Sequence, residues 1–135
     1  MKNTSLQQDY IKRAKNRLIA LEKLVELESW ADVVRESQEV VELALKAMLQ
    51  NAQIAVPRIH DVSQILLEHA SRFSEATQKH LKQLAAISHD LRRDRELSFY
   101  GSDDLTPSEF YTESDAKEAF KNAKFVVETV QKEVT

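Results

Sequence analysis

The chain has 135 residues, no cysteine and a formal net charge of −3. These values exclude a disulfide framework and a cysteine-based metal site, and they disfavour a protein that binds nucleic acid through overall positive charge. The apolar runs are only a few residues long and the first ten residues lack the apolar segment of a signal peptide, so we expect a soluble cytoplasmic protein without a membrane span.

The composition favours an all-α fold. One glycine and two prolines are very few for this length, and 30% of the residues are charged. Residues that favour helices, such as alanine, leucine, glutamate and lysine, dominate the rest. The length is that of one domain, so we expect a single helical domain over residues 1–135.

Apolar residues recur at steps of three and four, which is typical of helices with one buried face. The pattern predicts long helices over residues 6–27, 29–51, 74–97 and 112–133. The short connection between the first two predicts an antiparallel hairpin. We expect the core to contain one set of large side chains from these helices. They are Trp30, Val41, Leu45, Leu84, Leu91, Phe120 and Val127.

Polar residues at the expected helix ends predict the caps. Ser29 is placed to cap the second helix, with Asp32 three positions on. Asp61 is placed to cap a short third helix after Pro57. Further along, residues 106–109 read Thr-Pro-Ser-Glu, which predicts a single helical turn. Thr112 is placed to cap the last helix, and Gly101 to end the helix before it.

Arg95 stands where the buried face of the fourth helix should continue. Leu84, Ser88 and Leu91 precede it at helical spacing, so the next position on that face would normally be apolar. A half-buried arginine needs carboxylates, phosphate or carbonyl oxygens. Arg95 with Tyr100 therefore either binds a phosphate or a base at a cleft, or seals the helix end against acids of residues 102–115.

The other polar groups admit plainer interpretations. His60 beside Asp61 has the residue types of a metal pair, but we expect its ring to pack in the loop. His80 and His89 are expected to be solvated. Charged residues of the second helix are expected to form a solvated face. They are Glu39, Glu42 and Lys46. No phosphate-binding loop, zinc motif or nucleophile elbow is present, so we expect no metal and no cofactor.

Four segments together resemble one known family. They read QEVVELALKAML, VPRIHDV, RRDRELSFYG and YTESDAKEAFKNAKFVVE, and the resemblance that they carry spans most of the chain. This combination resembles the HEPN (higher eukaryotes and prokaryotes nucleotide-binding) domain family. The resemblance implies an up-and-down helical bundle of four long helices and one short helix, which usually dimerises. It also implies possible partnership with a nucleotidyltransferase-like protein in a toxin–antitoxin or stress system.

The sequence departs from the family at its catalytic motif. Members that cut RNA have an arginine followed, after four to six residues, by a histidine. Arg95 falls on the arginine position, but those three spacings hold Tyr100, Gly101 and Ser102. Histidine transfers protons near neutral pH, whereas tyrosine, with an ordinary pKa of about 10, is a poor base there.

The resemblance therefore favours a non-catalytic module that binds a nucleotide or RNA. Its binding candidates are Arg92, Arg95, Phe99, Tyr100 and His60. Two alternatives stay open. One is a metal-independent ribonuclease that uses Arg95 with a nonstandard partner such as His60 or His89. The other is a purely structural interaction module in which Arg95 only stabilises the fold.

Overall fold

The computed structural model describes the backbone of residues 2–55, 62–100 and 106–134, and the side chains of residues 6–55, 62–90 and 106–134. Its elements are all helical. In chain order they are α1 (Lys2–Glu26), α2 (Trp30–Asn51), α3 (Ser63–Glu68), the 3₁₀ turn η1 (Ala70–Arg72), α4 (Glu75–Gln78), α5 (Leu81–Tyr100), α6 (Pro107–Phe110) and α7 (Glu113–Val134). No strand occurs in these residues, which confirms the predicted all-α class.

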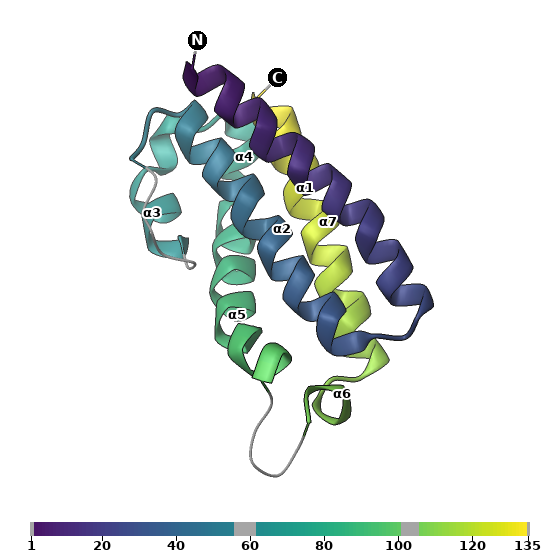
Figure 1. Cartoon of the computed structure of the whole chain (residues 1–135). Helices are drawn as coiled ribbons and strands as arrows, with labels where there is room; N and C mark the ends of the chain where they lie inside the picture. Colours follow the sequence, from purple (N-terminus) through teal and green to yellow (C-terminus); the bar gives the residue numbers. More distant parts are fainter. Residues whose placement is uncertain (1, 56–61, 101–105, 135) are drawn as a thin grey trace.

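Helix α2 is the central helix of the bundle. It packs against α1 and α7 on one side and against α5 on the other, and the short α3 lies beside α5 (Figure 1). The start of α1 and the end of α7 lie at the same end of the bundle (Figure 1). Because α2 has neighbours on several sides, more than half of its residues are buried, in contrast to a helix that has only one apolar stripe.

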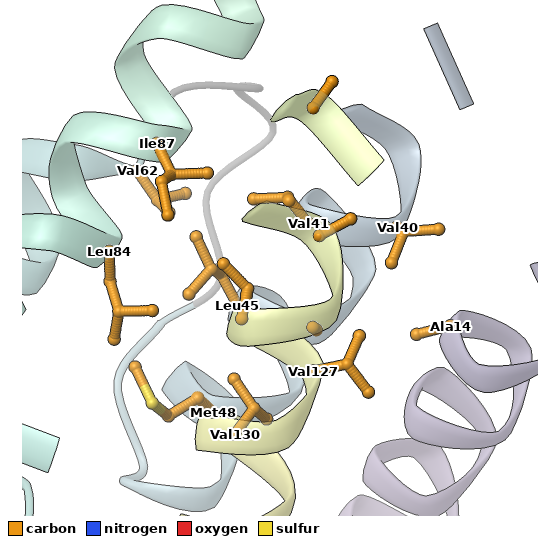
Figure 2. Packing of buried hydrophobic residues seen from close by; sticks show 14 of the residues in the cluster. Ala14, Val40, Val41, Leu45, Met48, Val62, Leu84, Ile87, Val127 and Val130 are labelled. Carbon is orange, nitrogen blue, oxygen red and sulfur yellow. The ribbon is translucent and has the colours of Figure 1, made fainter. Parts of the chain in front are cut away.

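The core consists of aliphatic side chains from α1, α2, α5 and α7. Figure 2 shows Leu45 and Met48 of α2 between side chains of α5 and α7. The predicted core is largely confirmed: Val41, Leu45, Leu84 and Val127 are buried. Two further members are only half-buried at the edge of this cluster. They are Trp30 and Phe120. The side chain of Leu91 lies outside the described residues.

The hairpin between α1 and α2 forms as predicted, through three residues. Its turn is closed by two backbone hydrogen bonds: Glu28 N–H donates to the Val25 carbonyl at 3.0 Å, and Ser29 N–H donates to the Leu24 carbonyl at 3.0 Å. This is a Schellman ending, in which Glu28 has a positive φ of 58°. Ser29 does occupy the cap position of α2, but its hydroxyl donates to the Asp32 carboxylate at 2.6 Å and accepts no backbone N–H.

The predicted helix over residues 74–97 is wrong as a single element. The chain forms a first turn, α4, and then α5, which extends to Tyr100. Between them His80 N–H donates to the carbonyl of Thr77, three residues back, which tightens the backbone into a turn. The α4 turn is held by α7: Glu133 accepts hydrogen bonds from the backbone N–H of Ser74 (3.2 Å), from its hydroxyl (2.6 Å) and from the Thr77 hydroxyl.

The caps of the later helices are mostly as predicted. Thr106 accepts a hydrogen bond from Glu109 N–H at the start of α6. Thr112 and Asp115 form a reciprocal capping box at α7, with N–H to side-chain distances of 2.9 and 3.2 Å. Helix α3 differs, because its cap position is Val62, whose N–H donates to the buried Ser88 hydroxyl of α5 at 3.1 Å. The expected cap residue, Asp61, lies outside the described residues.

Candidate functional site

The site residues predicted from the sequence fall on parts of the chain whose side chains are not described. Helix α5 carries Arg92, Arg95, Phe99 and Tyr100 in its C-terminal half. The side chains of these four residues lie outside the described residues, and His60 lies there with its backbone. Their roles therefore stay predictions, and the site is built from the described residues that come directly before them on α5.

A groove of about 330 Å³ lies between α5 and α7. Its floor contains apolar groups from three helices and from the residue that follows α6: Val34 of α2, Ile87 of α5, Ala119 of α7 and Tyr111. These four are at most 6% exposed. The groove exists because α5 and α7 both pack on α2 and leave a space between them. A volume of this size falls at the lower end of the range for small-molecule sites.

The rim of the groove is polar and acidic. Helix α5 contributes Gln83 and Asp90, and α7 contributes Glu118 and Asn122, with Asp115 at its start. The described residues that line it include no lysine or arginine. Ionised carboxylates only accept hydrogen bonds, whereas the two amides both donate and accept. The rim can therefore bind amino groups and hydroxyl groups, and its charge repels a phosphate placed inside the groove.

Sequence reasoning missed these rim residues. On α5 the lining positions Gln83, Ala86 and Asp90 follow each other at steps of three and four, and on α7 Asp115, Glu118 and Asn122 do the same. Each stripe is an ordinary solvated face in a single helix. The spacing of these residues within each helix is visible in the sequence. Only the packing of α5 and α7 on α2 brings the two stripes to opposite sides of one groove.

The charged residues of α2 are not the solvated face that the sequence suggested. Arg17 of α1 donates to the carboxylates of Glu36 at 3.1 Å and Glu39 at 2.8 Å. Lys46 donates to Glu42 at 3.1 Å, and both side chains are at most 20% exposed. The correction has a simple cause: α1 covers this side of α2, so the charges are half-buried between two helices and pair there.

The described histidines give no metal site. His80 is exposed and its ring meets that of Phe125 edge-on, with centroids 5.3 Å apart. His89 is also exposed, on the outer side of α5. Within residues 6–55, 62–90 and 106–134, no three histidine, aspartate or glutamate side chains are placed to hold a metal ion together. In the same part of the chain, no helix has the length and apolar character required to cross a membrane.

These elements define the chain as an all-α helical bundle with an acidic groove beside α5. The family model described as HEPN domain matches residues 7–134, which is nearly the whole chain. The chain therefore belongs to the HEPN domain family, as the sequence motifs predicted. No curated protein matches it, and no solved structure does.

Proposed function

We propose that this chain is a non-catalytic HEPN domain, spanning residues 1–135, that binds a nucleotide or RNA. The observation that carries the proposal is the family match over residues 7–134, since membership of this family supports a role related to nucleotides or RNA. The missing histidine after Arg95 supports the absence of cleavage, because Tyr100 stands in its place.

We propose that the groove between α5 and α7 binds the nucleoside part of the ligand. Its apolar floor suits the face of a base, and its carboxylates suit the amino group of a base and the hydroxyl groups of a ribose. The phosphate has to point out of the groove, since three carboxylates line it. Arg92 and Arg95 follow Asp90 on α5 within one to two turns, and we propose that they bind this phosphate.

Phe99, Tyr100 and His60 complete the proposed site. An RNA strand is read mainly through bases that stack on aromatic side chains, and Phe99 and Tyr100 end the helix that carries Arg95. We further propose a homodimer, a nucleotidyltransferase-like partner and a cytoplasmic role in a toxin–antitoxin or stress system. The family resemblance of the sequence motifs supports these three parts of the proposal.

Calorimetric titration with AMP, CMP and UMP tests the proposal. AMP and CMP should bind more tightly than UMP, because only they carry an amino group on the base. Arg95→Ala should weaken AMP binding by about 1.5–3 kcal/mol, the contribution of a hydrogen bond to a charged group, which corresponds to about 10- to 150-fold. Ala86→Trp should abolish binding, because Ala86 lines the groove and its side chain is exposed.

The matched control is Ala76→Trp, the same substitution at an exposed position on α4. If the Ala86→Trp variant still binds AMP, the groove is not part of the binding site. If the wild-type protein binds neither a mononucleotide nor single-stranded RNA, the proposal is refuted. A cleavage assay on mixed RNA tests the second candidate, a ribonuclease. RNA cleavage by the wild-type protein that is lost in both the Arg95→Ala and the His89→Ala variants would favour the ribonuclease instead.

A further inference from the structure

Helix α1 carries an exposed stripe whose charge changes sign along its length. The stripe consists of Lys12, Lys15, Ile19, Glu22 and Glu26, and all five side chains are exposed. The positions follow at steps of three, four, three and four, so they lie along one side of the helix. We call this set the α1 stripe. Its basic half precedes Ile19 and its acidic half follows it.

Three features of the α1 stripe are unfavourable in a single copy of the chain. Like charges stand one turn apart, at positions 12 and 15 and at positions 22 and 26, where they repel. Glu26 ends α1, where the carbonyl groups favour a cation. Ile19, an apolar side chain, is 66% exposed to water. The opposite side of the helix explains none of these features, because it packs against α2 and α7.

The rest of the chain does little to compensate for these charges. In the part of the chain that the structure describes, the stripe takes part in one ion pair, between Lys23 and Glu26 at 3.4 Å. Both side chains of that pair are about 70% exposed, so water screens it. Lys12, Lys15 and Glu22 form no ion pair among the described residues. The charges of the stripe are therefore available to a partner.

We infer that the α1 stripe binds the α1 stripe of a second copy of this chain, with the two helices antiparallel and a two-fold axis at Ile19. Lys12 and Glu26 lie seven positions on either side of Ile19, so each lysine comes level with the partner's glutamate, about 10 Å from the axis. Lys15 and Glu22 lie four and three positions away, and they face each other in the same manner.

The arrangement relieves all three unfavourable features together. The two Ile19 side chains bury each other on the axis, and each ion pair occurs twice because a two-fold interface is reciprocal. Each acidic half then lies beside a basic half. Left-handed crossing at about 20° suits helices whose contacts repeat at these steps. A partner that carried only acidic or only basic groups would match one half of the stripe and repel the other.

This interface is distinct from the proposed nucleotide site. Helices α1 and α5 lie on different sides of α2, so the interface leaves the groove and the end of α5 free (Figure 1). Its contacts are mainly charged and its apolar centre is one residue, so we expect a weak association that salt dissociates. Nucleotide binding and self-association through α1 are measured separately, so failure of one proposal does not affect the other.

A disulfide at the axis tests the geometry directly. The chain has no cysteine, so Ile19→Cys introduces a single thiol that meets its own copy only if Ile19 lies on a two-fold axis. Mild oxidation at low salt should convert most of this variant to a covalent dimer. The control is Lys121→Cys, an exposed position on α7, which should form little covalent dimer under the same conditions. Equal cross-linking of the two variants would overturn the inference.

Charge reversal tests the pairing, with mass measured by sedimentation at low and high salt. Replacing Lys12 and Lys15 by glutamate should abolish association through α1, since acids then face acids. Replacing Glu22 and Glu26 by lysine as well should restore it, because the reversed stripe is complementary to itself again. The fourfold variant places charges as the helix dipole prefers, so it should remain folded. Failure of the fourfold variant to regain the wild-type mass at low salt would overturn the inference.

Discussion

Removing the carboxylate of Glu133 should release α4 from the end of α7. This carboxylate accepts hydrogen bonds from the N–H and hydroxyl of Ser74 and from the hydroxyl of Thr77, across almost 60 positions of sequence. Ser74 is exposed, so water replaces the lost acceptor there. Thr77 is 3% exposed, and its hydroxyl donor would lose the carboxylate inside the protein.

The expected cost of Glu133→Ala is about 2 kcal/mol, within the range for a buried donor that is left without its charged acceptor. An unfolding entropy of about 2.1 cal/mol/K per residue gives about 0.28 kcal/mol/K for a chain of this length, so the melting temperature should fall by about 7 °C. Urea denaturation followed by circular dichroism measures the free energy. Amide exchange should also accelerate in α4 more than in α2, because the release is local.

The matched control is Glu128→Ala, the same change at an exposed position on α7, which should alter stability by less than about 0.5 kcal/mol. Thr77→Val keeps the shape of the buried side chain and removes its hydroxyl. In the double variant the two costs should not add, with a coupling of about 1–2 kcal/mol. Additive costs, or a Glu133→Ala variant as stable as the control, would refute the role of Glu133 in holding α4.

Two further changes test the core and the attachment of α3. Leu45→Ala should destabilise the fold by about 2–5 kcal/mol, because Leu45 is fully buried. The control Leu27→Ala, at a side chain that is 62% exposed, should cost under about 1 kcal/mol. Urea denaturation measures both free energies, and similar costs would contradict the central position of Leu45. Ser88→Ala should cost about 1–3 kcal/mol, because it leaves the N–H of Val62 without its acceptor. That N–H should then exchange faster by NMR, and an unchanged exchange rate would argue against the bond.

Most of the helices could be predicted because their signal is local. The apolar stripe of α2, the capping box at Thr112 and the proline turn at Pro107 each depend on residues a few positions apart. The divided helix at Lys79 could not be predicted in the same way. The α4 turn is bonded to Glu133, a residue from the far end of the chain, and residues 74–97 contain no sign of that contact.

The candidate site also has some residues that the sequence could indicate and others that it could not. Arg95 and Tyr100 are visible in the sequence as a departure from a helical pattern and from a family motif, and their roles remain predictions. Asp90, Glu118 and Asn122 have no such signal, since each belongs to a polar stripe that is ordinary for its own helix. Their joint position depends on how far α5 and α7 stand apart on α2.

The sequence by itself determined the helical class, the family and the positions of the main buried stripes, because hydrophobic periodicity and capping act over a single helix. Tertiary structure decided which polar faces meet. It places the charged side chains of α2 against α1, where Arg17 pairs with them. It also holds Glu28, in the turn after α1, at a positive φ that usually needs glycine. The physical reason is that the rotation and spacing of packed helices depend on all their contacts together, and no local stretch of residues contains that information.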